Sequence, residues 1–555
     1  MKVIIDAVSA VCKELYDVQV DVVLTRPDEQ FGDYATNVAL QLSKQLGKNP
    51  REIAEAIAVK TRENLGGVVA NVTVAGPGFI NITLTDKILL SGVRGDISQL
   101  GTYKKVLLEY SCPNAFKELH TGHLYQTIVG DSIGRILEAT GSTVFRANFG
   151  GDVGLHVAKC LYGIVRQIGE DVSRLANVPE SGRPEWVSAA YVLGAKAYEE
   201  DETAKAKMTE INSQIYGFHA NNDHESALAQ IYWQCRDWSY DYFKTFYDSI
   251  KVEAFDKYYP ESTTIEPGME LVKQHTGSVF KESDGAVVYE GEDAGLHTRV
   301  FITSKGLPTY ETKDLGVINN ETKDFSYDKR IIITGNDQSE YMKVVFAALN
   351  ALNPDLAAKQ THFTNGTVRF GSGQKMSSRL GNVTRAVDVI QTVTETVATE
   401  NPASSDHYST ALAAIKYSFL KHRLGGDIAF DIKESVSLEG NSGPYLQYAH
   451  ARARSILAKA DVSTVELSEL EPGERTLVRK LTEYNDVVGR AASEFMPHHI
   501  CSFLYELAQT FNRFYEQNRV IGDPRQAERL TLVAMYTDIL KNGLGLLGLH
   551  APEHM

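Results

Sequence analysis

The sequence has few cysteines and no long apolar run. Its 555 residues include five cysteines, an odd number, far apart and never in a Cys-x-x-Cys pair: Cys12, Cys112, Cys160, Cys235 and Cys501. This pattern argues against a disulfide framework and a cysteine zinc site, and is typical of a reducing compartment. No apolar stretch approaches the length that crosses a bilayer, and an acid at Asp6 interrupts the N-terminal segment, unlike a secretory signal. We therefore expect a cytoplasmic protein that uses no membrane.

An excess of positive charge is also missing. The formal net charge is −15, whereas a basic domain is the usual footprint of a nucleic-acid-binding protein. The balance does not exclude such binding, because local patches rather than the sum steer a partner. The hydrophobic content of 43% and charged content of 23% are those of a globular protein. At this length two to four domains are expected.

Residues 1–103 are predicted to form a small α+β domain. An apolar stripe predicts a helix over residues 35–46. Asn49 and Pro50 fit the N-cap and first position of a further helix. Ile80, Ile82 and Leu84 alternate with polar residues, which predicts a half-buried strand.

Residues 104–395 show the pattern of a parallel α/β sheet. The segments KKVLLEY (104–110) and STVFRANF (142–149) are predicted strands separated by a helix, and residues 157–250 are a predicted helical insertion. The sheet pattern is expected to return at 299–305, 330–336 and 368–378. Beyond about 395 no strand pattern persists, so residues 396–555 are predicted to be a helix bundle.

The segment SCPNAFKELHTGHL (111–124) places His120, Gly122 and His123 in the first turn of a predicted helix that follows a strand. Such a helix start offers unpaired N–H groups and the positive end of the helix dipole to an anion. Two imidazole donors there suit a polyphosphate. The alternative, which stays open, is that the histidines only cap the helix and Gly122 only turns the chain.

A second loop, GSGQKMSSRLGN (371–382), carries Lys375 and Arg379. Alone it could be a solvated basic turn. Together with His-x-Gly-His, its Lys-Met-Ser resembles the paired motifs of the class I aminoacyl-tRNA synthetases. Further segments are similar to the arginyl-tRNA synthetase family: EYSCPN (109–114) with Lys117, GGDVGLH (150–156), PTYETKDLG (308–316), GPYLQYAHAR (443–452), LLGLHAPEHM (546–555), FGDYATN (31–37) and GPGFINI (76–82). The resemblance runs from about residue 20 to Met555.

The resemblance implies an α/β class I synthetase with a Rossmann-like catalytic domain, a helical insertion, a small N-terminal domain and a C-terminal helix bundle. It also implies an arginine–tRNA ligase that activates L-arginine with ATP and transfers it to the 3′ end of its tRNA. ATP is expected to meet His120, Gly122, His123, Lys375, Met376 and Ser377, with Lys117 and Arg379 as further catalytic cations. Magnesium would arrive with ATP, and no zinc, other metal site or organic cofactor is expected.

The family pattern also assigns the other two substrates. The guanidinium of arginine would bind Glu109, Tyr310 and Asp314, because a planar cationic fork prefers carboxylates and hydroxyls. Asn114 and Gln338 would hold the ammonium end. The alternative for Tyr310 and Asp314, four residues apart, is a helix-surface pair.

The anticodon is expected to meet the helix around GPYLQYAHAR by stacking and base-edge bonds, through Tyr445, Gln447, Tyr448, Arg452 and also His450. The alternative for Tyr445 is packing in a core.

Some positions depart from the family pattern, and other functions compete. Ser378 replaces the second lysine of Lys-Met-Ser-Lys, Val153 a tryptophan, His156 a glutamine, and Tyr125 an arginine. One competing function is a small-molecule nucleotidyltransferase, and another is an inactive relative that only binds RNA. We expect a monomeric enzyme.

Overall fold

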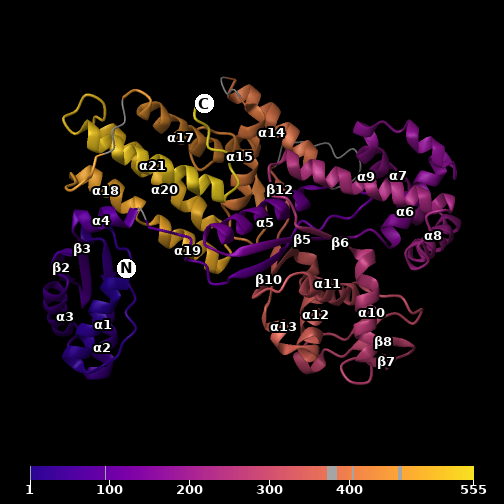
Figure 1. The fold of residues 1–555 in the computed structure, drawn as a ribbon, viewed down its shortest axis with the longest axis horizontal. Helices are drawn as coiled ribbons and strands as arrows, with labels where there is room; N and C mark the ends of the chain where they lie inside the picture. Colours follow the sequence, from indigo (N-terminus) through magenta and orange to yellow (C-terminus); the bar gives the residue numbers. More distant parts are fainter. Residues whose placement is uncertain (1, 94, 372–383, 403–405, 461–464) are drawn as a thin grey trace.

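The computed structural model describes residues 2–93, 95–371, 384–402, 406–460 and 465–555. The molecule is elongated (Figure 1): a small N-terminal domain lies at one end, the catalytic sheet at the centre, and a helical insertion at the other end. The C-terminal helices lie between the N-terminal domain and the sheet.

The N-terminal domain packs helices on a three-stranded antiparallel sheet of order β1-β3-β2. Its elements are α1 (Lys2–Tyr16), a 3-10 turn (Glu29–Phe31), β1 (Tyr34–Thr36), α2 (Val38–Leu46), α3 (Pro50–Asn64), β2 (Val69–Ala75), β3 (Phe79–Leu84) and α4 (Asp86–Val93). The predicted strand at Ile80–Leu84 is confirmed, and so is the N-cap, where the Asn49 side chain accepts a hydrogen bond from the N–H of Arg51. The helix predicted from residue 35 begins at Val38, because residues 34–36 pair with β3 instead.

The central sheet has five strands, all parallel, in the order β11-β10-β4-β5-β6. The strands are β4 (Lys105–Glu109), β5 (Thr143–Gly150), β6 (Lys257–Pro260), β10 (Lys329–Gly335) and β11 (Gln360–Asn365). Val106, Leu107 and Leu108 of β4 are fully buried, as expected for a strand covered by helices on both faces.

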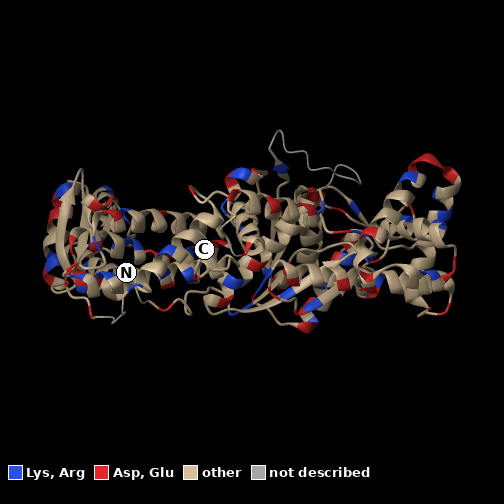
Figure 2. Cartoon of the chain, turned by 90° about the horizontal axis from the view of Figure 1, so that it is seen from above, with Lys and Arg blue, Asp and Glu red and all other residues tan. Residues whose placement is uncertain are grey.

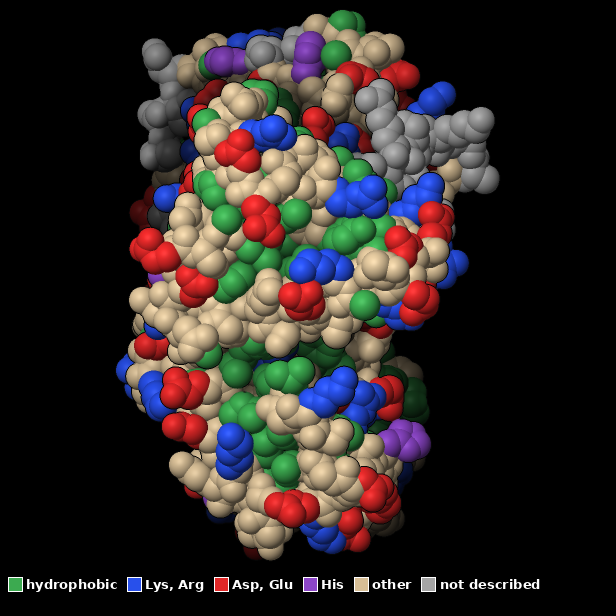
Figure 3. Space-filling view, turned by 90° about the vertical axis from the view of Figure 1, so that its right-hand side faces the viewer, with side chains coloured by type: hydrophobic (Ala, Val, Ile, Leu, Met, Phe, Trp, Pro, Cys, Tyr) green, Lys and Arg blue, Asp and Glu red, His purple; other side chains and the backbone are tan. Residues whose placement is uncertain are grey.

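The helices and turns between these strands carry most of the site. They are α5 (Thr121–Ala139), α6 (Leu155–Ile168), 3-10 turns at Val172–Asn177 and Glu180–Gly182, α7 (Arg183–Glu200), α8 (Glu202–Ala220), α9 (Ala227–Ser249), η4 (Glu261–Thr264), α10 (Ile265–Gln274), α11 (Tyr310–Asp324), η6 (Asn336–Gln338), α12 (Ser339–Leu352) and α13 (Pro354–Ala358). Helices α6 to α9 form the predicted insertion between β5 and β6. In Figure 3, which views this end of the molecule, hydrophobic side chains gather on both sides of a waist.

Two predicted strands lie outside the central sheet. Residues 299–302 form β9 (Arg299–Ile302), which pairs with β8 (Ala286–Tyr289), and β8 with β7 (Lys281–Ser283), in a small antiparallel sheet; a 3-10 turn (Glu292–Ala294) connects β8 and β9. Residues 368–370 form β12 (Val368–Phe370), which pairs with β13 (Ile428–Phe430) in the region predicted to lack strands. The prediction that both segments extend the parallel sheet is therefore wrong. The sheet is completed by β6 and β11, which were not predicted.

The C-terminal region is otherwise helical, as predicted. Its helices are α14 (Ala386–Glu400), α15 (His407–Leu420), α16 (Ile432–Ser435), α17 (Gly443–Leu457), α18 (Pro472–Leu481), α19 (Tyr484–Glu494), α20 (His498–Gln517) and α21 (Gln526–Leu546). Four of them, α14, α15, α19 and α21, pack against α5, the helix that begins at the His-x-Gly-His motif. The C-terminal helix bundle therefore packs directly on α5 of the catalytic domain.

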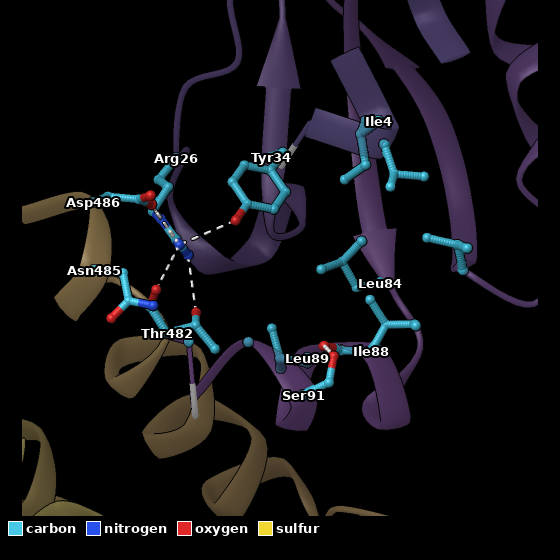
Figure 4. A pocket seen from close by; sticks show the side chains of 14 residues that line it. Ile4, Arg26, Tyr34, Leu84, Ile88, Leu89, Ser91, Thr482, Asn485 and Asp486 are labelled. Carbon is cyan, nitrogen blue, oxygen red and sulfur yellow. Dashed lines mark hydrogen bonds and ion pairs between the residues drawn. The ribbon is translucent and has the colours of Figure 1, made fainter. Parts of the chain in front are cut away.

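The N-terminal domain is fastened to α18 and α19 by ion pairs. Arg26 binds Asp486 at 2.9 Å and donates to Tyr34 and to the backbone of Thr482 (Figure 4). Arg475 binds the buried Asp33 at 2.6 Å. A cavity of about 400 Å³ remains between the two domains. Arg26 and Asp486, which line it, already form an ion pair with each other. We regard the cavity as part of the domain contact.

Acidic and basic residues are interspersed along the described molecule in Figure 2. Within the described residues no helix combines the length and the apolar character that spanning a membrane requires.

Candidate active site

A pocket of about 700 Å³ opens at the carboxyl ends of β4 and β10, where ligands of open parallel sheets bind. The loop before α5, the first turn of α5, η6 and the β11–β12 connection form its walls. Its lining residues include Cys112, Asn114, His120, Gly122, His123, Gln126, Asp337, Gln338, Asn365, Phe370 and Thr384. Four of the predicted ATP and arginine contacts, together with Gly122, therefore line one pocket.

The two motif histidines cap the helix they begin. His120 is the N-cap of α5, and its Nδ1 accepts hydrogen bonds from the N–H groups of Gly122 (3.0 Å) and His123 (3.3 Å). His123 Nδ1 accepts the N–H of His120 in return (3.2 Å), and the two rings stack 3.7 Å apart. Since each Nδ1 is an acceptor, the proton of each neutral ring sits on Nε2.

Both rings are kept neutral. Burial, reinforced by the charge of Lys117, lowers the pKa of His120 to about 4. Burial, with His120 and Lys117 adding to it, also lowers the pKa of His123. Helix capping and phosphate binding by these histidines are therefore compatible. Capping fixes the tautomer of each ring, and this tautomer leaves one Nε2–H donor on His120 and one on His123.

Gly122 is required by the same cap. A Cβ atom at this position would lie 2.9 Å from Cε1 of His120, so a side chain would displace the ring that caps the helix. The glycine keeps the helix start open to the pocket.

The loop before the motif has an unusual backbone. Ser111, Cys112 and Phe116 all have positive φ angles (72°, 45° and 66°), a conformation that costs non-glycine residues energy and often marks functional sites. Buried contacts hold the loop there: Ser111 Oγ lies 2.8 Å from the hydroxyl of Tyr247 in the insertion and accepts a hydrogen bond from Thr127 of α5.

Lys375, Met376, Ser377, Ser378 and Arg379, predicted at the phosphates, lie outside the described residues. The chain on either side of them reaches the pocket. Phe370, which ends β12, lines it, and Thr384 also lines it. Thr384 accepts hydrogen bonds from the N–H and hydroxyl of Thr121, and Ala386 donates to Leu119. Thr384 is therefore bonded to the chain next to His120, although it lies 263 residues from Thr121 in the sequence.

A buried carboxyl group lies behind the pocket. Asp314 of α11 is 7% exposed and lies next to the hydroxyl of Tyr341, which donates to Gln338 on the pocket wall (3.2 Å). Burial, and then the nearby charge of Glu109, raises the pKa of Asp314 well above that of an ordinary carboxyl group. Because Asp314 is buried, the helix-surface alternative is excluded for it.

Glu109, predicted to bind the guanidinium of the substrate, already binds one. Its Oε2 lies 2.5 Å from Nη2 of Arg330 on β10, and both side chains are almost fully buried. The same arginine binds Glu321 of α11 through Nε at 2.5 Å. One carboxylate oxygen of Glu109 is therefore paired within the protein, and the predicted contact of Glu109 with the substrate stays a prediction. Arg330 was not predicted to belong to the site. As the charged first residue of the run RIIITGN, it looks in the sequence like the ordinary start of a strand.

The remaining predicted arginine contacts lie around the same region. Tyr310, four residues before Asp314, is 67% exposed. Asn114 lines the pocket. Near them Lys313 forms a buried ion pair with Glu261 of η4, and its ammonium lies 5.3 Å from the centre of the Tyr310 ring. Neither Lys313 nor Glu261 was predicted.

Lys117 contacts an aromatic ring of the insertion. Its ammonium lies 4.0 Å from the centre of the Tyr191 ring in the insertion, a cation–π contact. It still influences the site, since its charge helps to lower the pKa values of His120, His123 and His156.

The residues that depart from the family pattern are accommodated locally. Val153 packs in the core of the insertion, and Tyr125 packs edge-on against Phe419 of α15. His156 faces the carbonyl of Gly151, and burial lowers its pKa to about 3.

The predicted RNA contacts on α17 divide into two groups. Gln447 and His450 are buried and hold the C-terminal segment, bonding to the carbonyls of His550 and Pro552. We correct the prediction of base contacts for these two on that ground. Tyr448 is exposed, Tyr445 is half-buried against Tyr505 with its hydroxyl bound to Asn512, and Arg452 lies over Tyr515.

A parallel sheet with a His-x-Gly-His motif after its central strand, a segment from Thr384 that hydrogen-bonds to the start of the following helix, and a C-terminal helix bundle define a class I aminoacyl-tRNA synthetase. Three family models cover the chain: the class I (R) tRNA synthetase catalytic domain matches residues 84–431, the arginyl-tRNA synthetase N-terminal domain residues 2–84, and the DALR anticodon-binding domain residues 446–555. The chain belongs to the arginyl-tRNA synthetase family.

Individual relatives agree with this assignment. The chain is 30% identical to an arginine–tRNA ligase of Thermobifida fusca, over 95% of this chain and 94% of that protein. It is 29% identical to one of Synechococcus elongatus at the same coverage. Among solved structures, arginyl-tRNA synthetase of Thermus thermophilus matches with a TM-score of 0.80 and 26% identity, covering both chains completely. The one from Plasmodium falciparum, at 21% identity and a TM-score of 0.81, supports the fold. The predicted family, fold class and ligase activity are thereby confirmed.

Proposed function

We propose that this chain charges arginine tRNA in two steps: the pocket joins the carboxylate of L-arginine to the α-phosphate of ATP with release of pyrophosphate, and then transfers the arginyl group to the 3′ end of the tRNA, releasing AMP. The observation that carries the assignment is the buried carboxyl group of Asp314 behind a pocket whose other wall presents two imidazole donors. One wall suits a guanidinium and the other suits phosphates.

ATP binds at the start of α5 in this proposal. The Nε2–H groups of His120 and His123 and the helix N-terminus attract its phosphates, and they require no reorganisation as negative charge moves onto pyrophosphate. The resemblance adds Lys375, Met376, Ser377 and Arg379 from the second motif loop. Magnesium would accompany ATP. Lys117 acts at a distance, through the pKa values of the histidines rather than by contact.

Arginine binds with its guanidinium toward Asp314 and Tyr310 and its ammonium end toward Asn114 and Gln338. Support comes from the contacts that connect Gln338, Tyr341 and Asp314, since they join the two ends of the proposed subsite. A buried carboxylate rejects analogues without a matching cation strongly, because it would be left unpaired.

The tRNA partner is proposed to meet the exposed or half-exposed members of α17, namely Tyr445, Tyr448 and Arg452, by stacking on single-stranded bases. We further propose that the enzyme works as a monomer in the cytoplasm, where its tRNA is used.

Asp314→Asn tests the arginine subsite. The variant keeps the shape but cannot ionise, so the arginine KM should rise by about 10²–10³, the equivalent of the ~3–5 kcal/mol lost when a buried charge pair is broken. The KM for ATP should stay within a few-fold. Steady-state aminoacylation with the cognate tRNA measures both constants, and an arginine KM near that of wild type would remove Asp314 from the subsite.

The pH dependence gives the same test a second readout. Burial and the nearby charge of Glu109 raise the pKa of Asp314, so at any pH below that raised pKa the carboxyl group must lose a proton to pair with the guanidinium. The affinity for arginine should therefore rise with pH until the raised pKa is passed. In Asp314→Asn this dependence should disappear.

A further inference from the structure

Residues 110–119, the lead-in loop of the His-x-Gly-His motif, are held by hydroxyl groups of α9. This helix runs from the insertion toward the central sheet (Figure 1). Ser239, Tyr242 and Tyr247, spaced three and five residues apart, lie within about half the circumference of the helix. Each of them places its hydroxyl group on the lead-in loop.

Two of these hydroxyl groups bind backbone N–H groups of the loop. The Ser239 hydroxyl accepts a hydrogen bond from the N–H of Phe116 at 3.0 Å, and the Tyr242 hydroxyl accepts one from the N–H of Leu119 at 3.3 Å. Phe116 and Leu119 are both buried, and Leu119 directly precedes His120. Because a buried N–H needs a partner, the two acceptors on α9 determine where this part of the loop can lie.

The third hydroxyl group connects α9 to three parts of the catalytic domain. Tyr247 is buried, and its hydroxyl lies 2.8 Å from that of Ser111 and accepts a hydrogen bond from Asn148 of β5 at 3.3 Å. Ser111 is hydrogen-bonded in turn to Thr127 of α5 at 2.7 Å. The lead-in loop, the sheet and the motif helix therefore meet α9 at one buried network of polar groups, and such networks rigidify their surroundings when they are satisfied.

The contacts of α9 coincide with the strained part of the loop. Ser111 and Phe116 have φ angles of 72° and 66°, and Cys112 between them has one of 45°. Non-glycine residues keep such angles only where the surrounding structure holds them. Ser239 and Tyr247 bind two of these three residues directly. Without these contacts we expect the loop to relax and the first turn of α5, which follows it at once, to move with it.

We infer that the three hydroxyl residues of α9 are positioning residues for ATP. They hold the lead-in loop in the strained conformation that presents the Nε2–H groups of His120 and His123 to the phosphates. This inference rests on the proposed function. Among the described residues that line the pocket none comes from α9, so the three act through the loop rather than by touching ATP. The insertion would thereby take part in building the ATP site.

A relaxed loop would weaken ATP binding in a defined way. If only the held conformation binds ATP, the apparent dissociation constant is the intrinsic one divided by the fraction of molecules in that conformation. Loss of one hydrogen bond lowers the ratio of held to relaxed loop by about 2- to 10-fold. The KM for ATP should therefore rise. The kcat at saturating ATP should change little, because bound ATP restores the held conformation.

Three substitutions each remove one hydroxyl group and keep the rest of the side chain: Tyr247→Phe, Tyr242→Phe and Ser239→Ala. In aminoacylation at saturating arginine and tRNA, each should raise the KM for ATP by about 3- to 10-fold and leave kcat within about twofold of wild type. The double variant of the two tyrosines should have a higher KM for ATP than either single variant. A change that only destabilised the folded protein would leave this KM unaltered.

Two further variants serve as controls. Ser239→Thr keeps the hydroxyl group and should keep the wild-type KM for ATP. Tyr232→Phe removes a buried hydroxyl group from the same helix, but that group bonds to the carbonyl of Asp152 and to His219 instead of the lead-in loop. Its KM for ATP should stay within about twofold of wild type.

Hydrogen exchange tests the same contacts in the full-length protein without substrate. The Tyr247 hydroxyl binds Ser111 rather than the N–H groups of Phe116 and Leu119, yet Tyr247→Phe should speed the exchange of both amides, because the loop is held as a unit. Saturating ATP with magnesium should slow the exchange again. In Tyr232→Phe both amides should exchange as in wild type.

Unchanged exchange of both amides in Tyr247→Phe would overturn the inference. A KM for ATP within about twofold of wild type in the double variant would also overturn it, as would an equal rise in Tyr232→Phe. If Tyr247→Phe does not fold, Ser239→Ala and Ser239→Thr decide, and equal KM values for these two would overturn it. A wild-type protein that does not attach arginine to its tRNA would instead refute the proposed function, whereas the exchange result without substrate would still stand.

Discussion

The two ring nitrogens of His120 have different roles: Nδ1 caps α5, and Nε2 is the proposed donor to ATP. Two substitutions can separate these roles. Asparagine places an acceptor near the position of Nδ1 and is a preferred N-cap, but it does not reach as far as Nε2. Glutamine reaches the Nε2 position with an amide N–H, but it is a poorer cap. We predict that His120→Asn is stable and nearly inactive, and that His120→Gln is less stable but retains more activity.

The magnitudes follow from the contacts. His120 accepts two backbone N–H groups, and loss of an N-cap costs about 0.5–2 kcal/mol of the free energy of unfolding, so His120→Gln should lose about 1 kcal/mol. Loss of one preorganised donor to a developing negative charge lowers the rate by about 10²–10³, so His120→Asn should lose that much in kcat for adenylate formation. Neither change should alter the KM for arginine strongly, because His120 is not among the proposed arginine contacts.

Urea unfolding measures the first quantity, and rapid-quench measurement of adenylate formation in the presence of tRNA measures the second. His120→Ala, which loses both nitrogens, is the control and should show both defects together. The reasoning fails if His120→Asn forms adenylate within a few-fold of the wild-type rate, or if His120→Gln is the slower variant of the two.

Two further predictions concern the framework of the site. Gly130→Ala should destabilise the protein by about 1–3 kcal/mol, because the added Cβ would lie 2.2 Å from the Tyr110 ring; Gly545→Ala, with open space around it in α21, should instead stabilise slightly, and thermal unfolding compares the two. Asp33→Asn should loosen the N-terminal domain, because Arg475 loses a charged partner, at a cost of about 1–3 kcal/mol. Hydrogen exchange should rise in residues 2–93 and not in the central sheet, and equal protection in both regions would contradict the assigned contact.

Features that depend on neighbours in the sequence could be predicted. Asn49 before Pro50, the alternation of Ile80 and Ile82, and the short strand before His120 each carry their signal within a few residues. The motif spacing located the pocket for the same reason, since a strand, a tight loop and a helix follow one another directly. Gly122 stands where a Cβ would lie 2.9 Å from the capping ring, but the positive φ angles of Ser111, Cys112 and Phe116 have no such signal in the sequence.

Features that depend on partners far away in the sequence could not be predicted. The segments that form β6 and β11 are short and lack a clear alternation, and their place in the sheet is set by β5 and β10. Residues 299–302 have the apolar run of a central strand, yet they pair antiparallel with β8 in a separate sheet. Gln447 and His450 stand among residues suited to RNA, but their partners are carbonyl groups more than 100 residues away.

The charged residues of the proposed arginine subsite are the clearest example of a feature that depends on residues far apart in the sequence. A sequence displays Glu109, Asp314 and Glu321 as three acids and gives no indication which of them is available to a ligand. That depends on Arg330, which is 221 residues from Glu109 and reaches it only because β4 and β10 are neighbours. Glu109 and Glu321 each bind Arg330, whereas burial and the charge of Glu109 raise the pKa of Asp314. Three acids that look alike in the sequence therefore have different surroundings in the fold.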